Sequence, residues 1–174
     1  MIGTLLLASV AATDVPAECG FTKEARQLAA LIILDDKQQR PQLRCDAKLT
    51  QLAAKKAKEM ALSGHVNHWG GGGANSRVIE MGYPLDRRYG IGISNQIEAV
   101  AGGYDDAATM WQEFKASEGH RRHLLGEHPS YREQDEIGVG YYYRWESPHI
   151  TYWAVYVARK EDGSDDQVVL LEKP

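Results

Sequence analysis

The chain of 174 residues has only two cysteines, Cys19 and Cys45, and it contains no CxxC pair. A cysteine-based zinc site is therefore not expected, because such sites need closely spaced thiolates or a nearby Cys–His pair. In an exported protein, an even number of cysteines favours a disulfide, which here would add roughly 3–4 kcal/mol of stability through loop entropy. In a cytosolic protein the same residues would be ordinary thiols.

The sequence also lacks an excess of positive charge. Its 20 Lys and Arg residues are outnumbered by 24 Asp and Glu residues, and the formal net charge is −4. The basic pairs Arg87–Arg88 and Arg121–Arg122 are short and have acidic residues nearby, so we interpret both as solvated surface. We predict no nucleic-acid partner and no general attraction to anionic membranes.

Motifs of several enzyme classes are absent. The sequence contains no HExxH and no GxSxG, and the glycine run Gly70–Gly73 is not followed by Gly-Lys-Ser/Thr. These absences argue against a zinc-peptidase helix, a serine-hydrolase elbow and a phosphate-binding loop.

Long hydrophobic runs are scarce, and the N-terminal one, MIGTLLLASVAA, is too short for a transmembrane helix, which needs ~20 apolar residues. Its length and its small residues are typical of a signal peptide cleaved near Ala11 or Ala12, although the usual basic segment is missing. We predict that residues 1–12 are a signal peptide, complete or truncated, and that the protein is secreted or periplasmic. A packed N-terminal segment of a cytosolic protein is the alternative.

The remaining sequence fits one globular domain. With 43% hydrophobic and 25% charged residues, the composition is that of an ordinary folded protein, and a single domain commonly spans ~100–200 residues. There is no internal repeat and no linker. We predict one domain over residues 20–160 and an acidic C-terminal tail over residues 161–174.

Helical periodicity dominates the first half of the chain. Thr22 is placed to cap a helix that extends to about Asp36. Asp46 is placed to cap a second helix, and Gly64 stands where a left-handed C-terminal residue belongs. Asn75 is placed to cap a short third helix over residues 76–81.

The second half changes to a period of two. Residues 91–100 predict a short strand, residues 105–106 the cap of a helix, and Ser117 the start of a further turn or short helix. Apolar residues alternate over 137–145, and a second apolar run follows over 152–158, which predicts an aromatic-rich β-hairpin.

Histidine and acidic side chains concentrate in two segments. His65 and His68 follow the second predicted helix, and the stretch from Asn95 to Gly126 contains Glu98, His120 and His123. Imidazoles and carboxylates drawn together from separate segments predict one polar cleft, and this donor set suits zinc or another divalent cation. Each histidine pair is spaced to share a helical face, so a site made of all four histidines is a second possibility.

Several segments resemble motifs of bacterial CAP-domain proteins, whose family includes cysteine-rich secretory proteins, insect venom antigens and plant pathogenesis-related proteins. EAVAGGY at 98–104 resembles the family's GENIAxGY, and SEGHRRHLL at 117–125 resembles its SPGHRxNIL. The run from Met60 to Tyr83 resembles "M…H…R…GY", and residues 137–153 resemble the terminal hairpin. The resemblance covers about residues 22–160, and its motifs are specific in combination.

The resemblance implies an α+β fold, a three-layer α-β-α sandwich with a small antiparallel sheet. It also implies a cleft lined by two histidines and two acidic residues, which holds a divalent cation in some family members. By position, His68 and His120 correspond to the histidines and are the implied metal ligands, with zinc as the favoured ion. Glu98 corresponds to the first acidic residue, although Ala99 replaces the asparagine that follows it in the family.

The second acidic residue departs from the family pattern. The family glutamate lies three residues after a tryptophan, but Phe114 stands three residues after Trp111. Glu113 is therefore our candidate for the cleft, one place off. Because a helix turns ~100° per residue, this shift changes the direction of the side chain.

Four further residues are candidates for orienting the site through hydrogen bonds to its ligating side chains: His65, Asn95, Ser117 and His123. Some histidines are better explained by hydrogen bonds to loop carbonyls than by metal ligation: His65, His123, His128 and His149.

Three functions remain open on the sequence alone. The first is a secreted module that binds a lipid, a glycan or a protein in the cleft, with a metal ion tuning the site. The second is a metal-assisted peptidase or esterase, in which the metal held by His68 and His120 lowers the pKa of a bound water and Glu98 is the general base. The third is a structural role, with the polar residues forming a buried network that fixes loops.

Overall fold

The computed structural model describes residues 17–90 and 95–162, so the predicted signal peptide and nearly all of the predicted acidic tail lie outside the described residues. None of the helices within these ranges is long and apolar enough to cross a membrane. The elements in chain order are η1 (Ala17–Cys19), α1 (Lys23–Ile33), β1 (Arg44–Cys45), α2 (Ala47–Ser63), α3 (Ala74–Glu80), η2 (Arg87–Tyr89), β2 (Glu98–Gly102), α4 (Ala107–Ala116), α5 (Glu118–Leu124), α6 (Pro129–Arg132), β3 (Glu136–Tyr143) and β4 (Thr151–Ala158).

The four described strands form one sheet in the order β1-β3-β4-β2. β3 and β4 pair antiparallel as the predicted hairpin, and β2 pairs antiparallel with the other edge of β4. β1 is two residues long and runs parallel to β3, so the sheet is mixed rather than purely antiparallel.

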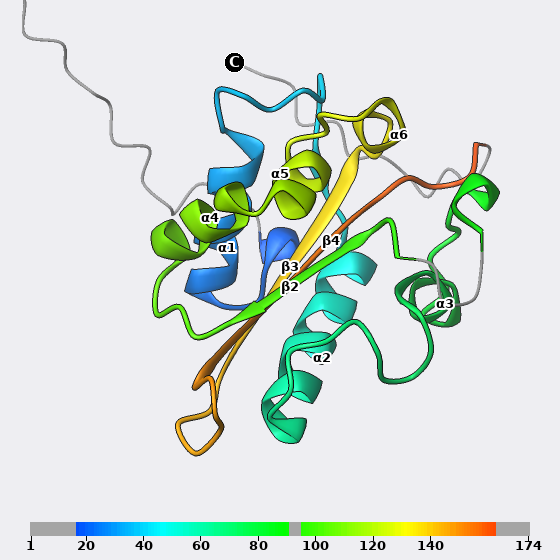
Figure 1. Cartoon of the computed structure of the whole chain (residues 1–174). Coiled ribbons are helices and arrows are strands. Elements are labelled where there is room, and N and C mark those ends of the chain that lie inside the picture. The colour runs from blue at the N-terminus through cyan, green and yellow to red at the C-terminus, as the bar shows by residue number, and fades with distance from the viewer. Residues whose placement is uncertain (1–16, 91–94, 163–174) are drawn as a thin grey trace, which may run out of the picture.

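Helices cover both faces of this sheet (Figure 1). The side chains of β4 alternate between two cores, because successive residues of a strand point to opposite faces. Trp153 and Val155 pack with α1, α4 and the end of α5, whereas Ala154 and Tyr156 pack with α2 and α3. The three-layer α-β-α architecture implied by the family resemblance is therefore confirmed.

The helix ends follow the local signals in the sequence. Thr22 Oγ1 accepts a hydrogen bond from the backbone of Ala25 at 3.1 Å, and Asp46 Oδ1 caps α2 in the same way. Gly64 ends α2 with a left-handed φ of 74°. The prediction that Asn75 caps α3 was wrong, because α3 begins at Ala74 and its N-cap is Gly73. Asn75 is buried inside the helix and donates hydrogen bonds to the carbonyl oxygens of residues 89 and 90 and to the side-chain oxygen of residue 96.

Helix α2 lies directly on two glycines of β3. A Cβ atom added at Gly138 would lie 2.1 Å from the backbone nitrogen of Thr50, and one at Gly140 would lie 2.1 Å from the carbonyl carbon of Ala53. No side chain fits in this space. The two glycines therefore set how closely the helix packs on the centre of the sheet.

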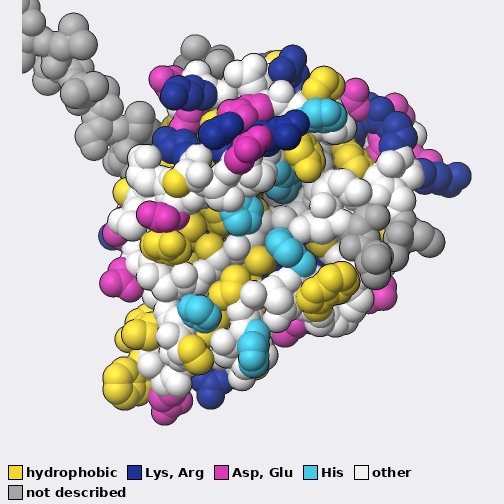
Figure 2. All heavy atoms as spheres, viewed as in Figure 1, with side chains coloured by type: hydrophobic (Ala, Val, Ile, Leu, Met, Phe, Trp, Pro, Cys, Tyr) yellow, Lys and Arg dark blue, Asp and Glu magenta, His cyan; other side chains and the backbone are white. Residues whose placement is uncertain are grey.

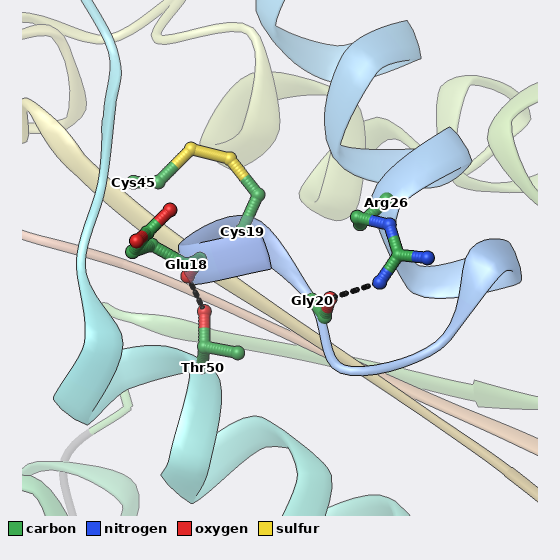
Figure 3. Close-up of a disulfide and its surroundings, with 6 residues drawn as sticks. All are labelled: Glu18, Cys19, Gly20, Arg26, Cys45 and Thr50. Carbon is green, nitrogen blue, oxygen red and sulfur yellow. Dashed lines mark hydrogen bonds between the residues drawn. A yellow bond between two sulfur atoms is a disulfide. The ribbon is translucent and has the colours of Figure 1, made fainter. Parts of the chain in front are cut away.

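Cys19 and Cys45 form a disulfide, as predicted for an exported chain (Figure 3). Their Cα atoms are 4.7 Å apart, although 26 positions separate them in sequence. The Thr50 hydroxyl donates a hydrogen bond to the carbonyl oxygen of Glu18 beside the bridge. These contacts attach the N-terminal segment to β1 and to the first turn of α2.

Candidate functional site

The candidate site is built around Glu98, the first residue of β2, whose side chain is fully buried. His68 Nδ1 donates a hydrogen bond to Glu98 Oε1 at 2.8 Å. Arg77 Nη2 donates to Glu98 Oε2 at 2.6 Å, and the Tyr156 hydroxyl donates to the same oxygen. Both carboxylate oxygens are thus engaged, as a buried charge requires.

The ionised form of Glu98 is the stable one. Burial by itself raises the pKa of Glu98, but the hydrogen bond from His68 and the positive charge of Arg77 outweigh burial, and the net pKa lies below the ordinary value. Burial and the neighbouring carboxylate raise the pKa of Tyr156 well above that of free tyrosine. Tyr156 therefore remains a neutral hydrogen-bond donor at physiological pH.

Arg77 also organises the loop that carries His68. Its Nη1 atom donates to the carbonyl oxygens of His68, Gly70 and Gly72 at 3.0, 2.9 and 2.6 Å. The glycines wrap around the guanidinium with positive φ angles, 106° at Gly70 and 89° at Gly72, a conformation that other residues rarely adopt. Lys56 is almost fully buried in α2 and donates to the carbonyl oxygen of Trp69 in the same loop.

Asn95 fixes the start of β2 and the orientation of the site. Its Oδ1 accepts from the backbone nitrogen of Glu98 at 3.0 Å, and its Nδ2 donates to the Glu98 carbonyl oxygen at 3.1 Å. Asn95 Nδ2 also lies 3.0 Å from His68 Nδ1. An ionised carboxylate can only accept hydrogen bonds, so the His68 nitrogen that faces Glu98, Nδ1, must carry the proton. The contact between Asn95 Nδ2 and His68 Nδ1 then joins two donors and is not a hydrogen bond. In a neutral His68 ring, the free lone pair is then on Nε2. The His68 side chain is 41% exposed.

His120 lies on α5 and is the second imidazole of the site. Its ring packs edge-on against Phe114 with 5.0 Å between centroids. Burial lowers the pKa of His120, and a positive charge on a protonated His68 would lower it further. Figure 2 shows histidine side chains gathered on this face of the molecule, around β2 and α5.

Glu113 is placed differently from Glu98. It is exposed on α4, and the Tyr104 hydroxyl donates a hydrogen bond to its Oε2 at 3.2 Å. Among the described contacts, none joins Glu113 to His68, Glu98 or His120. The position where the family pattern has glutamate is occupied by Phe114, which is buried against His120.

The other predicted residues lie around the site or away from it. His65 is exposed, and its Nδ1 lies 2.8 Å from the carbonyl oxygen of Ser63. Ser117 is an exposed residue between α4 and α5 and makes no side-chain cap. His123 is buried and packs on the ring of Tyr131 at 5.0 Å. Burial, with the charge of Arg40, lowers the pKa of His123 to about 3.

Two residues of the network, Arg77 and Tyr156, were not proposed as site residues from the sequence. Arg77 does lie in the run that resembles "M…H…R…GY", so the motif contained a signal for it. Tyr156 belongs to an apolar strand in which every residue is buried, and nothing local distinguishes its hydroxyl from the rest.

The donor set for a metal ion is small. Within residues 17–90 and 95–162, no group of three or more His, Cys, Asp or Glu side chains is placed to hold a metal. Glu98 instead accepts the hydrogen bond from His68 Nδ1 and so orients the imidazole, leaving Nε2 available to a ligand.

A separate apolar groove of about 550 Å³ lies between α1 and α4. Its apolar lining is formed by Ala30, Leu31, Leu34, Ala107, Ala108 and Trp111. At its edge, Asp35 accepts hydrogen bonds from Trp111 Nε1 at 2.9 Å and from Lys115 Nζ at 3.1 Å. No feature of the sequence had predicted this groove.

Comparisons with known proteins agree with this architecture. The model of the cysteine-rich secretory protein family, CAP, matches residues 22–157. An outer surface protein from Borrelia burgdorferi has a similar structure, with a TM-score of 0.56 and 18% sequence identity, over 77% of this chain and 90% of that protein. At this identity the likeness concerns the fold alone. No curated protein matches the chain in sequence.

Proposed function

Because the chain belongs to the cysteine-rich secretory protein (CAP) family, we propose that it is a secreted binding module whose ligand is held by the imidazoles of His68 and His120. Export is supported by the signal-like residues 1–12 and by the disulfide, since disulfides persist in oxidising compartments. The structural relative is itself called an outer surface protein.

The observation that carries this proposal is the full engagement of the Glu98 carboxylate. A general base must have a free oxygen aimed at the proton that it removes, and its pKa must lie near the working pH. Glu98 gives both oxygens to His68, Arg77 and Tyr156, and its pKa is lowered. The arrangement therefore supports a rigid binding surface over the hydrolase alternative.

The exposed groups favour a polar ligand. Of the three candidate classes, a glycan fits them better than a peptide or a lipid. His68 Nε2 and the His120 ring offer hydrogen bonds, and the neighbouring Trp69 is 58% exposed and offers a flat aromatic surface. Placed polar groups beside an aromatic surface are two of the features that small-molecule sites combine.

The predicted zinc fits this site only in part. The two imidazoles would be the protein ligands, with Glu98 orienting His68, whereas tight zinc sites use three or four protein ligands. A bound divalent cation would polarise a ligand oxygen. The proposal does not depend on the cation, because His68 and His120 also act as hydrogen-bonding groups.

A glycan array probed with the full chain tests the proposal. We expect a defined set of glycans to bind the wild type, and His68→Ala and His120→Ala to weaken this binding at least tenfold. His128→Ala is the matched control, because His128 is exposed and lies just before α6 as its N-cap. Cleavage of a peptide or ester panel that His68→Ala abolishes, in a folded variant, would instead support the hydrolase.

The groove between α1 and α4 favours lipid binding as a second candidate function. Its volume of about 550 Å³ and its apolar lining suit a single acyl chain. A fluorescent fatty acid should bind the wild type and should be blocked by Ala108→Trp, which fills the groove. Leu62→Trp, at an exposed position of α2, should leave binding unchanged. Equal binding by both variants would contradict this candidate.

A further inference from the structure

The turn between β3 and β4 exposes large apolar side chains at one end of the molecule. Tyr143 is 60% exposed, Trp145 is 71% exposed and Ile150 is 40% exposed. In Figure 2 hydrophobic side chains gather at the lower left corner, where Figure 1 places this turn beyond the end of the sheet. The site residues described above lie on other segments, so this turn needs an explanation of its own.

The turn is held in one conformation by its own hydrogen bonds. The backbone nitrogen of Arg144 donates to the Ile150 carbonyl oxygen at 2.7 Å, and Ile150 donates to Ser147 at 3.1 Å. The Ser147 hydroxyl is nearly buried and donates to the Arg144 carbonyl oxygen at 2.7 Å. The exposed side chains therefore extend from a rigid base, which lowers the conformational entropy that is lost when they bind a partner.

Ile150 is held in an unfavourable backbone conformation. Its φ is 64°, and it is the one residue other than glycine with a positive φ in the described parts of the chain. A β-branched residue is a true outlier in this region, where glycine or asparagine would relieve the strain. The strain is therefore located in the turn, at an apolar residue that is 40% exposed.

The shape and size of the turn limit its partner. A stable protein interface needs roughly 800 Å² on each side, more than three side chains at the tip of a hairpin provide. Small-molecule sites are concave, whereas this tip projects from the sheet. Tryptophan and tyrosine are the residues that favour the boundary between lipid headgroups and acyl chains.

Charge gives a further limit. Arg144 and Glu146 lie 4.0 Å apart and cancel each other at the tip, and the whole chain has a net charge of −4. Anionic headgroups would therefore not attract this end of the molecule. A zwitterionic lipid surface matches both the charge and the aromatic composition.

We propose that the β3–β4 turn is a membrane-contacting tip, in which Trp145, Tyr143 and Ile150 enter the headgroup region of a zwitterionic bilayer. Three side chains give weak, reversible attachment, weaker than that of a lipid anchor. The tip brings the protein to a membrane surface, and it acts independently of the ligand held by His68 and His120.

Flotation of the full chain with phosphatidylcholine vesicles tests this proposal. We expect measurable binding by the wild type that 0.5 M salt leaves unchanged, about tenfold weaker binding by Trp145→Ala, and a smaller loss for Tyr143→Ala. The matched control is Phe21→Ala, which removes an aromatic ring outside the turn that is as exposed as Tyr143 and should bind like the wild type. Thermal unfolding of each variant verifies that the fold is intact.

Three results would overturn the proposal. The first is no binding of the wild type to phosphatidylcholine vesicles. The second is binding only to anionic vesicles that salt abolishes, which would indicate charge rather than aromatic insertion. The third is equal loss with Phe21→Ala and Trp145→Ala. If the wild type forms a dimer that Trp145→Ala dissociates, and neither protein binds vesicles, the tip contacts a second copy instead.

Discussion

Arg77 Nη2 and Glu98 Oε2 lie 2.6 Å apart in an ion pair whose side chains are 6% and 0% exposed. The pair joins α3 to β2, and the same guanidinium holds the carbonyl oxygens of the loop that carries His68. The position of His68 is therefore coupled to the pair. Removing Arg77 would therefore disturb both the ion pair and the loop.

Removing Arg77 tests this coupling. Arg77→Met should lower the free energy of unfolding by about 3–5 kcal/mol, because it leaves a buried carboxylate without its counter-charge. Urea denaturation measures the loss, with Arg122→Met as control, since Arg122 is exposed and lies 3.8 Å from an exposed Glu118. The control should change stability by less than about 0.5 kcal/mol. A similar change for both variants would show that the pair contributes little.

The double variant Arg77→Met with Glu98→Gln separates the pair from the loop contacts. If the buried charge dominates, the double variant should lose less stability than the sum of the two single variants, because no uncompensated charge remains. Strict additivity would mean that Arg77 acts mainly through the glycine carbonyls.

Local signals in the sequence predicted the helices well. Asp46 and Gly64 mark the two ends of α2, and a helix cap depends only on residues a few positions away. The sequence predicted the hairpin for the same reason, because alternation along each strand is local. The two-residue parallel strand β1 could not be predicted, since its pairing with β3 joins residues 44–45 to residues 136–137.

The site was harder to predict for the same physical reason. The resemblance suggested His68, Glu98 and His120, but the hydroxyl that completes the Glu98 network comes from Tyr156, 58 positions away in sequence. Glu113 illustrates a second difficulty. A shift of one position on a helix rotates the side chain by ~100°, and Phe114 rather than Glu113 packs against His120.

The glycines of β3 give a sharp test of helix packing. Gly140→Ala places a Cβ 2.1 Å from the α2 backbone, so we expect a loss of about 3 kcal/mol or more, as in overpacked cores. Gly119→Ala is the matched control, because nothing lies within 4 Å of its added Cβ on α5. The control should gain about 0.5–1 kcal/mol from helix propensity. Equal stability of both variants in thermal unfolding would contradict the close approach.

The disulfide should contribute substantially to stability. Replacing both cysteines, Cys19→Ser with Cys45→Ser, is expected to cost about 3 kcal/mol, because 26 positions separate the bridged residues and the unfolded chain regains that loop entropy. Chemical denaturation with and without dithiothreitol measures this. The reductant should destabilise the wild type and leave the double variant unchanged. An equal effect on both proteins would point to a cause other than the bridge.

Zinc binding tests the role of the two imidazoles. Calorimetric titration at pH 7.5 should give binding weaker than that of structural zinc sites, whose binding free energies are roughly 10–16 kcal/mol, because only His68 and His120 are available. His68→Ala should reduce the affinity at least tenfold, and His128→Ala should not. Affinity comparable to a structural site would require a third protein ligand, with Glu113 as the first residue to replace.

The buried imidazole of His123 predicts how stability depends on pH. Its pKa is lowered by burial and by the charge of Arg40 to about 3, from an ordinary 6.5. Between these values the unfolded chain binds a proton at His123 and the folded chain does not, so stability falls as the pH falls, by at most about 1.4 kcal/mol per pH unit. Urea denaturation at pH 7, 6 and 5 should show this slope in the wild type and in His128→Leu, and a smaller slope in His123→Leu.

Two other groups of the site also titrate, and neither obscures the contribution of His123. Glu98 contributes at lower pH, because the stability from its lowered pKa is lost only as the pH falls below the ordinary value of 4.5. His120 has a lowered pKa as well, and its titration changes the stability in the same direction in the wild type, in His128→Leu and in His123→Leu. The difference between wild type and His123→Leu therefore isolates His123, and identical slopes in the two would mean that the buried ring takes up its proton without unfolding.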